Sequence, residues 1–447
     1  MKRRLFFLER VLYGDGKTPF NGVFALKIRG ALGEERFVSA LGRIQAKQSL
    51  LRARVEKDEQ GIPWWVVHEE TPPIPLRKLV RRTDADWIVE SRRELAMAFE
   101  TGRGPLLRVV WLYGGEVSDI ILAFHHCLCD GGSALALMRD LLSLLDKEGA
   151  DIGGAGAWVT MDELLRVNQS CGRRMERKAR GVSVLLRAGL SLGALLTSSK
   201  GKTLIPRSED YLLHWKLDSQ LSAGLLLYCK SLRITVNTLL CVTALYAFRQ
   251  VRGDKARQKV TCPVDIRRYH PGVKRETLFA FGLAVSLSLK KKRSDSWPVL
   301  LKEAQQIMSR KLDRLNATEF LLTMEYSHAA LTDMIKVLTY GKQGDDLMFS
   351  NMGKVDIPES YSSFEVETVY SPTVVGPFGN PTTLVATTYK GQLDLSFVSN
   401  RAVLPEEEGR AIRDKIEAVL RELGDGLAAA GLSDGLQGGE SAGRAAG

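Results

Sequence analysis

The sequence predicts an α/β or α+β protein of two domains. A chain of 447 residues is longer than one hydrophobic core usually spans. Segments with strand and helix periodicity alternate in both halves, which is typical of sheets flanked by helices. A basic and apolar segment at 161–205 separates the halves. We therefore expect an N-terminal domain over 1–160, a C-terminal domain over 206–426 and a disordered tail rich in Gly, Ala and Ser over 427–447.

The composition is that of an ordinary globular protein with a basic excess. Hydrophobic residues make up 45% and charged residues 26%, which excludes a collagen, a mucin-like stalk and a mainly disordered chain. The net charge of +11 is compatible with nucleic acid, an anionic membrane or a phosphorylated small molecule as partner. Six cysteines without a C-x-x-C pair indicate reduced thiols, so we expect a cytoplasmic protein. No stretch of the chain reaches 18 uninterrupted apolar residues, so we expect no membrane-spanning helix.

Periodicity predicts the elements of the N-terminal domain in chain order. Alternation of apolar and polar residues over 22–28 indicates a half-buried strand. Apolar residues at helical spacing predict a helix over 34–49 and another over 134–145, the second directly after a glycine pair. Four further segments have the length and composition of strands, and they cover 51–56, 64–68, 106–113 and 118–124.

The segment between the domains has two interpretations. Residues 166–202 contain nine Lys or Arg and one acid, and 182–196 is almost wholly apolar. One interpretation is an interfacial element, with cations at anionic headgroups and Leu side chains in the acyl region. The other is a crossover helix that packs between the domains and is basic only on its solvent-exposed face. After it, strand and helix patterns resume, with helices predicted near 236–250 and 297–315.

The stretch FHHCLCDGG at 124–132 is the most informative one for chemistry. It lies where a buried strand ends and a helix begins, and open α/β sheets place functional groups at such junctions. A neutral imidazole with a pKa near its ordinary value of about 6.5 suits a general base. Asp130 can lock the turn by an ion pair, and Gly131 lets a substrate or a backbone approach closely.

Three interpretations compete for this stretch. The two histidines fit a partly buried structural pair. A metal site would use His125, His126, Cys127, Cys129 and Asp130. Adjacent residues rarely all reach one ion, because tetrahedral sites draw ligands from two separated segments, so we expect no metal. The third interpretation is the pattern H-H-x-x-x-D-G, which is too specific to be a common chance match.

H-H-x-x-x-D-G after an apolar strand resembles the signature of acyltransferases related to chloramphenicol acetyltransferase. That superfamily includes condensation domains of nonribosomal peptide synthesis, alcohol O-acetyltransferases and polyketide-associated acyltransferases. Further segments resemble family landmarks in the expected order, and they are LLRARV at 50–55, GPLLR at 104–108, NTLL at 237–240, CPVDIRR at 262–268 and SNMG at 350–353. The D-F-G-W-G loop of the plant branch is missing, since this chain has GPFGN at 376–380 in that region.

The resemblance implies two chloramphenicol acetyltransferase-like subdomains, each a mixed sheet flanked by helices, with an active-site tunnel between them. It assigns the role of general base to His126 and a mainly structural role to His125. Asp130 would brace the loop through an arginine, for which Arg267 is the candidate by position. The residues that would provide structural or oxyanion support are Gly131, Arg267, Ser350 and Asn351.

The activity implied is transfer of an acyl group from a thioester, acyl-CoA or acyl carrier protein, to the hydroxyl of a lipid-like or polyketide-like acceptor. The thioester is then a co-substrate, and no bound cofactor is expected. Alternatives are a free-standing condensation enzyme that forms amides from carrier-bound substrates, and a catalytically silent relative that binds lipid or a carrier protein. We expect a monomer with a small-molecule alcohol or lipid as acceptor, and with peripheral contact to the inner membrane face through 166–202 as one alternative. Nucleic acid is not expected, because the basic residues are not interleaved with stacking aromatics.

Overall fold

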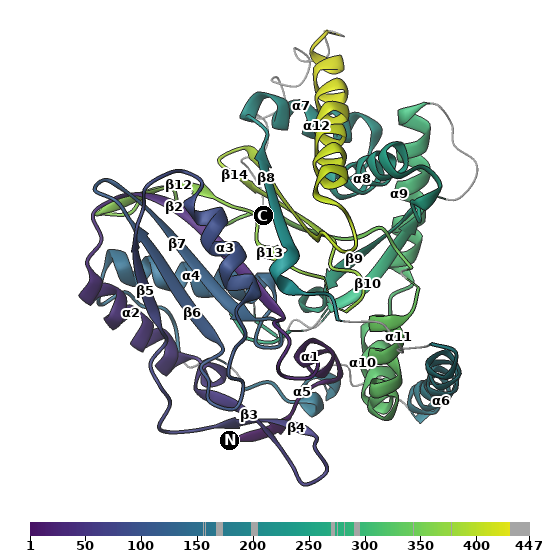
Figure 1. Ribbon diagram of the computed structural model, residues 1–447, viewed down its shortest axis with the longest axis horizontal. Helices are drawn as coiled ribbons and strands as arrows, with labels where there is room; N and C mark the ends of the chain where they lie inside the picture. Colours follow the sequence, from purple (N-terminus) through teal and green to yellow (C-terminus); the bar gives the residue numbers. More distant parts are fainter. Residues whose placement is uncertain are drawn as a thin grey trace, which may run out of the picture.

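The structure has two domains, each built on a mixed sheet flanked by helices, as the sequence predicted (Figure 1). It is a computed structural model. The described residues are 1–154, 156, 158–166, 173–197, 204–269, 273–274, 276–280, 282–289, 296–342, 344–376 and 378–429.

The N-terminal sheet has the strand order β12-β2-β7-β6-β5, and β13 pairs with β2 beside β12. Neighbouring strands are antiparallel except β5 and β6. Their bounds are β2 (Asn21–Gly30), β5 (Leu76–Val80), β6 (Leu107–Tyr113), β7 (Val117–His125), β12 (Phe364–Val369) and β13 (Thr373–Val374).

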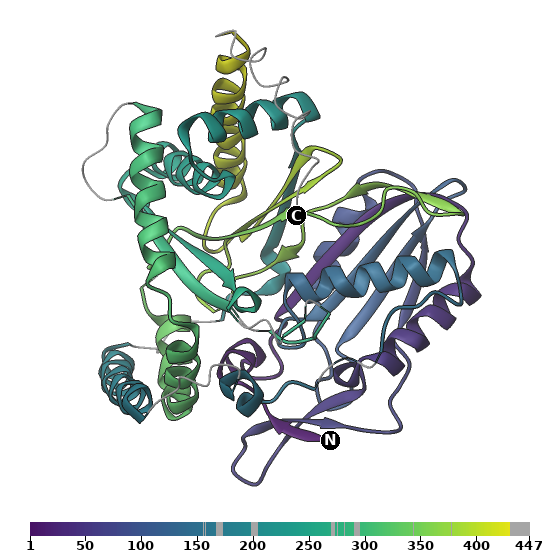
Figure 2. The same cartoon turned by 180° about the vertical axis from the view of Figure 1, so that it is seen from behind.

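Strand β2 is buried on both faces of this sheet, so the prediction of a half-buried strand at 22–28 is wrong. Helices α2 (Glu34–Lys47) and α4 (Gly131–Asp146) lie on one face, as Figure 2 shows. Helix α3 (Asp86–Ala96) lies on the other face, where Val23 and Ala25 of β2 share a core with Trp87 and, from the C-terminal half, Tyr370. Apolar and polar residues alternate along the sequence of β2, but residues of the second domain bury the face that would otherwise be exposed to solvent.

A small third sheet lies near the N-terminus. Its order is β1-β4-β3, and the antiparallel pair β3 and β4 corresponds to the predicted pair at 51–56 and 64–68. A short 3-10 turn precedes β3, so α2 ends two residues before the predicted boundary. The bounds are β1 (Lys2–Arg4), α1 (Phe7–Tyr13), η1 (Ser49–Arg52), β3 (Ala53–Lys57) and β4 (Pro63–Val67).

The C-terminal sheet has the order β10-β9-β11-β14-β15-β8. Its strands are β8 (Asp210–Lys216), β9 (Lys259–Asp265), β10 (Gly282–Ser288), β11 (Leu347–Lys354), β14 (Thr383–Tyr389) and β15 (Gln392–Asn400). Helices that contribute several buried residues to its main core include α7 (Ser219–Leu232), α8 (Val236–Arg252), α9 (Trp297–Asp313) and α12 (Glu406–Ala429). Helix α12 enters the predicted tail by three residues, and 430–447 lie outside the described residues.

The remaining helices lie below this sheet in Figure 1. They are α5 (Met161–Arg166), α6 (Arg173–Leu196), α10 (Ala317–Tyr326) and α11 (Leu331–Tyr340). Helix α6 packs on α10 and α11 at the outer side of the molecule, so the prediction of a crossover helix between the domains is wrong. Residues 167–172 and 198–203 of the predicted segment lie outside the described residues.

Two strands from the C-terminal half complete the N-terminal sheet. Strand β12 pairs with the outer part of β2, Phe364 opposite Gly30, and β13 pairs nearer its start, Thr373 opposite Val23. The segment 364–374 falls within the predicted second domain, yet its strands belong to the first. Because these strands cross over, the two domains share backbone hydrogen bonds.

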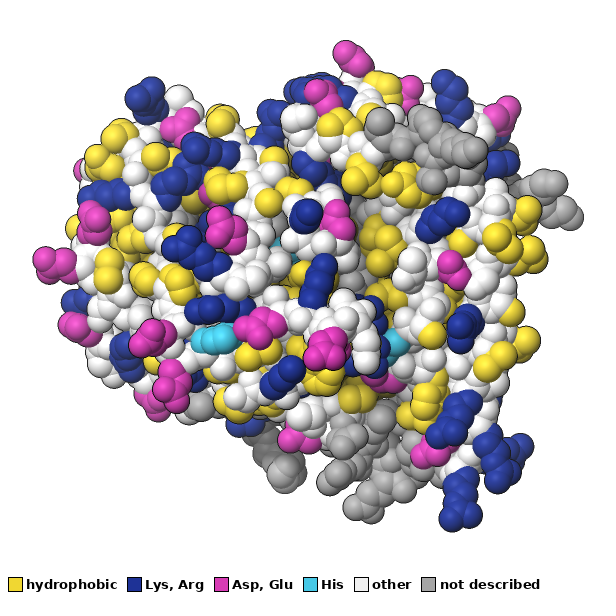
Figure 3. All heavy atoms as spheres, turned by 60° about the horizontal axis from the view of Figure 1, so that its bottom comes forward, with side chains coloured by type: hydrophobic (Ala, Val, Ile, Leu, Met, Phe, Trp, Pro, Cys, Tyr) yellow, Lys and Arg dark blue, Asp and Glu magenta, His cyan; other side chains and the backbone are white. Residues whose placement is uncertain are grey.

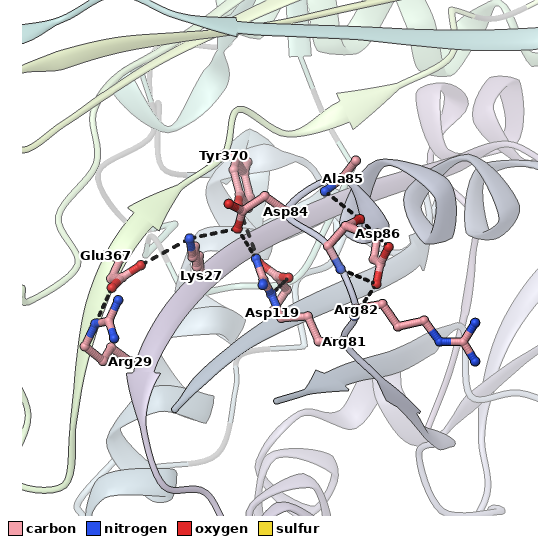
Figure 4. A network of polar contacts seen from close by, with 11 residues as sticks. Lys27, Arg29, Arg81, Arg82, Asp84, Ala85, Asp86, Asp119, Glu367 and Tyr370 are labelled. Carbon is pink, nitrogen blue, oxygen red and sulfur yellow. Dashed lines mark hydrogen bonds and ion pairs between the residues drawn. The ribbon is translucent and has the colours of Figure 1, made fainter. Parts of the chain in front are cut away.

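Charged side chains accompany this crossover (Figure 4). Nζ of Lys27 on β2 lies 3.4 Å from Oε2 of Glu367 on β12. Nearby, Asp119 is fully buried and accepts from Nε of Arg81 at 2.8 Å and from the Tyr370 hydroxyl at 3.5 Å. Burial raises the pKa of Asp119 to about 6, although Arg81 opposes that shift. The network ties the crossover segment to the N-terminal domain.

Candidate active site

The two adjacent histidines lie at the end of β7. His125 is the last residue of the strand and lies opposite Asn21 of β2. The backbone N–H of His126 still donates to Phe20 O at 2.7 Å, so the pairing continues one residue beyond the strand. A tight turn then leads to α4, which begins at Gly131. The junction of strand and helix that the sequence predicted is therefore present.

His125 has the surroundings of a structural residue. Its side chain is buried beside the rings of Tyr13 and Phe99. Its Nδ1 accepts from the backbone N–H of Cys127 at 3.3 Å, which leaves the proton of the neutral ring on Nε2. Burial lowers the pKa of His125 to about 3, and the neighbouring His126 adds to the shift. The ring is therefore neutral at physiological pH.

His126 is held in the tautomer that leaves its Nε2 free to accept a proton. Its Nδ1 lies 3.1 Å from the carbonyl oxygen of Cys129. A carbonyl oxygen only accepts, so Nδ1 carries the proton and Nε2 keeps its lone pair. The rings of Phe20 and Phe124 flank the imidazole with centroids 6.5 and 6.4 Å away. Burial lowers the pKa of His126, so its Nε2 is unprotonated at neutral pH.

An ion pair between the domains braces the turn after His126. Asp130 caps α4, and its Oδ1 accepts from the backbone N–H of Ser133 at 2.9 Å. Nη1 of Arg267 donates to Asp130 Oδ2 at 2.8 Å, and Nη2 donates to Oδ1 at 3.2 Å. This fork-to-fork contact joins the two residues that the family resemblance predicts to pair, one from each domain.

Further contacts hold the Arg267 guanidinium in place. Nη2 donates to Ser133 Oγ at 2.8 Å and to the Thr277 carbonyl at 3.2 Å, and Nη1 donates to Asp265 at 3.1 Å. The side chain also lies over the Phe279 ring at 4.4 Å. Sequence reasoning missed Ser133, because its place three residues after Asp130 indicates only that its backbone N–H can be capped and not that its hydroxyl contacts Arg267.

Strand β11 brings Met352 against the start of α4. A Cβ atom placed on Gly131 would lie 2.7 Å from Met352 Sδ and 2.9 Å from its Cε. Met352 occupies the irregular position in the pairing of β11 with β14, between Asn351 and Gly353. In this structure Gly131 therefore makes room for a side chain of the other domain, where the sequence suggested a substrate or a backbone. Met352 lies within the SNMG segment, but nothing in that segment indicated that its side chain reaches Gly131.

Ser350 and Asn351 lie on the same strand, and both are half-buried. The side-chain oxygen of Asn351 accepts from the backbone N–H of Gly353 at 2.9 Å. This bond leaves the NH₂ group of Asn351 available as a donor. The structure thus places Asn351 next to Met352, whose side chain lies against Gly131. A role of Ser350 or Asn351 at an acyl carbonyl stays a prediction.

We expect Gly131→Ala to lower turnover while leaving the fold intact. The new methyl group would displace the flexible end of Met352 and shift β11 from the start of α4, and a misplacement of about 1 Å can cost roughly 100-fold in rate. The measurement is kcat/KM together with thermal unfolding. Gly42→Ala on α2, where nothing lies within 4 Å of the added atom, is the control. If Met352→Ala does not restore activity to Gly131→Ala, the contact with Met352 is not the cause.

In the described part of the chain, no group of three or more His, Cys, Asp or Glu side chains is arranged to hold an ion. Cys127 and Cys129 are buried, and burial raises the pKa of both thiols well above the ordinary value, so they stay protonated.

Comparison with known sequences matches the N-terminal third of the chain. Residues 1–150 fit the family model described as Condensation domain. The polyketide synthase-nonribosomal peptide synthetase ffsA of Aspergillus flavipes is 29% identical over 144 residues, which is 32% of this chain and 3% of that protein. A plipastatin synthase of Bacillus subtilis is 26% identical over 148 residues, which is 33% of this chain and 4% of that protein. The chain thus spans a small fraction of the length of these relatives.

Comparison with solved structures covers nearly the whole chain. The first condensation domain of the calcium-dependent antibiotic synthetase, in complex with a substrate analogue, has a TM-score of 0.70 at 17% identity, covering 95% of this chain and 96% of that one. The starter condensation domain of rhizomide synthetase with C8-CoA has a TM-score of 0.64 at 16% identity, covering 94% and 92%. SgcC5 of Streptomyces globisporus, solved with a naphthyl ethanediol, has a TM-score of 0.64 at 14% identity, covering 95% and 99%. At these identities the likeness shows the fold.

Proposed function

From the condensation-domain family model over residues 1–150 and the condensation-domain fold of the whole chain, we propose that this protein is an acyl-transfer enzyme with His126 as its general base. The observation that carries the proposal is the tautomer and protonation of the His126 ring. Its Nδ1 proton is engaged by the Cys129 carbonyl, and burial keeps Nε2 unprotonated. The braced turn after it supports the same conclusion, since Asp130 is held by Arg267 of the other domain.

The proposed reaction joins an acyl thioester and an acceptor by addition to the thioester carbonyl, which forms an oxyanion, followed by loss of the thiolate. Nε2 of His126 removes a proton from the acceptor as the acceptor attacks the thioester carbon. The new bond to carbon forms, the carbon–sulfur bond breaks, and the imidazolium returns its proton to the leaving thiolate. The Asn351 amide and the N–H groups at the start of α4 are the proposed donors to the oxyanion. Alignment of both substrates supplies much of the acceleration.

The acceptor that we propose first is an amine, so that the product is an amide. The relatives that match residues 1–150 are nonribosomal peptide synthetases and hybrid synthetases, and these comparisons favour the condensation alternative over O-acylation. A hydroxyl acceptor is the second candidate. It is supported by the SgcC5 structure, a protein of the same fold that was solved with a diol.

For the donor, we propose a thioester on the phosphopantetheine of a carrier protein. The relatives support this source, and the C8-CoA complex of the rhizomide synthetase domain supports acyl-CoA as a substitute. Either donor presents the same thioester to His126. No cofactor bound permanently by the protein is needed for the step proposed here.

The test is a matrix of donors and acceptors with thiol release and product mass as readouts. Donors are acyl-CoAs of increasing chain length and the same acyl groups on a carrier protein, and acceptors are matched amines and alcohols of one carbon skeleton. We expect carrier-bound donors with amines to give the highest kcat/KM. Ester products in preference to amides would establish the second candidate. No acyl transfer from any donor, with the protein folded, would contradict the enzymatic proposal.

A further inference from the structure

Helix α6 is long, apolar and largely uncovered. Its most hydrophobic 18-residue window has a mean hydropathy of 1.4, and only 17% of that window is buried in the structure. By length and composition alone, α6 is long and apolar enough to cross a membrane, and so is the bent pair of α7 and α8 taken together. The uncovered surface of α6 is not used by the proposed reaction at His126.

The inner face of α6 is attached to the C-terminal domain by small residues and polar contacts. Ala179, Ser183 and Ala194 are its buried residues. Ser191 Oγ donates to Asp333 on α11 at 2.5 Å, and Lys178 pairs with Glu319 on α10 at 2.8 Å. A helix held along its length by these contacts lies on the molecule's surface and does not extend away from it.

The outer face of the second half of α6 is apolar and exposed. Leu185, Leu192 and Leu195 recur at three- and seven-residue spacing, which places them along one side of a helix. Leu195 is 83% exposed and Leu185 is 74% exposed. Six of the fourteen large hydrophobic side chains that are exposed in the described part belong to α6, and these are Val182, Val184, Leu185, Leu192, Leu195 and Leu196.

The first two turns of α6 are positively charged, in contrast to its apolar second half. Arg173, Arg174, Arg177 and Lys178 are all exposed, and Glu176 is the single acid of the helix. Figure 3 shows this side of the molecule, with hydrophobic side chains along the right edge and Lys and Arg side chains at the lower right. One helix therefore presents an apolar surface next to a cluster of cations.

We propose that α6 docks the protein onto an anionic lipid bilayer, lying in the plane of the interface. Leu185, Leu192 and Leu195 would enter the boundary between headgroups and acyl chains, and Arg173 to Lys178 would contact the lipid phosphates. The net charge of +11 complements an anionic surface. A second copy of the chain is a poorer occupant of this face, because it would bring the same cationic cluster.

Flotation of the full-length protein with vesicles tests this proposal. We expect binding to vesicles with about 30% anionic lipid, little binding to neutral vesicles, and release at about 0.5 M salt. Arg174→Gln/Arg177→Gln should weaken binding about 30-fold. These two residues are chosen because neither forms an ion pair with another described side chain, whereas Lys178 holds Glu319.

The apolar contribution is tested with Leu185→Ser/Leu192→Ser/Leu195→Ser. We expect at least a tenfold loss of vesicle binding. The matched control is Val38→Ser/Val80→Ser/Val89→Ser, which removes three exposed apolar side chains from the N-terminal domain. If the α6 triple variant does not fold, Leu195→Ser alone replaces it, since that side chain is the most exposed of the set.

Three outcomes overturn the proposal. One is the absence of binding to anionic vesicles by the folded wild-type protein. Another is an equal loss of binding in the control variant. The third is a dimer in sedimentation equilibrium that the α6 variant abolishes, since a second copy would then cover this face. Acyl transfer in detergent-free solution is measured in parallel, so that loss of docking is distinguished from loss of the proposed activity.

Discussion

We expect His126→Ala to lower kcat/KM by about 100- to 10,000-fold, the range that general acid–base catalysis contributes. The physical reason is the loss of the Nε2 lone pair that the hydrogen bond from Nδ1 to the Cys129 carbonyl makes available. The donor and acceptor pair with the highest turnover in the wild-type protein is used. His68→Ala is the control, because that histidine directly follows β4 of the small sheet and pairs with Glu56.

The pH profile of the wild-type protein is a second readout of the same base. Burial lowers the pKa of His126 below its ordinary value of 6.5, and only the unprotonated ring accepts a proton. As pH falls, kcat/KM should therefore decline with a midpoint below pH 6.5. An acid limb centred above pH 6.5, or near wild-type turnover in His126→Ala, would contradict the assignment.

The second large effect is expected for Arg267→Ala, on stability and on activity together. The substitution leaves Asp130 without its partner across the domain interface, and removal of one member of a buried pair costs roughly 3–5 kcal/mol. We expect the lower end, about 3 kcal/mol, because the Asp130 side chain is 21% exposed and partly solvated. The measurement is urea unfolding, with kcat/KM measured on the same preparations.

Two further variants separate the brace from general effects of charge. Arg267→Lys keeps the charge but loses the fork, so it should recover only part of the stability. Asp265→Ala removes the more exposed of the two carboxylates that Arg267 contacts and should cost clearly less. A double-mutant cycle of Asp130→Asn with Arg267→Ala should show a coupling of about 0.5–3 kcal/mol. A coupling near zero would mean that the ion pair does not brace the turn.

Much of the fold and the central part of the site were predictable from local patterns. The segments predicted as strands and helices in the N-terminal domain follow from the spacing of apolar residues, and the structure has them within a few residues of the predicted bounds. The pairing of Asp130 with Arg267 was expected only through the family resemblance, because 137 residues separate them. The burial of β2 on both faces was not predictable, because Tyr370 and its neighbours come from the other half of the chain.

The sequence by itself determined the two-domain α/β class, the position of the two histidines between strand and helix, and the basic and apolar character of α6. Each of these depends on neighbouring residues, whose periodicity and spacing are visible in the chain. Only the tertiary structure decided that β12 joins the N-terminal sheet, that Met352 fills the space over Gly131, and that α6 lies outside the domain interface. These features depend on contacts between segments far apart in the chain, and the packing of both domains selects them.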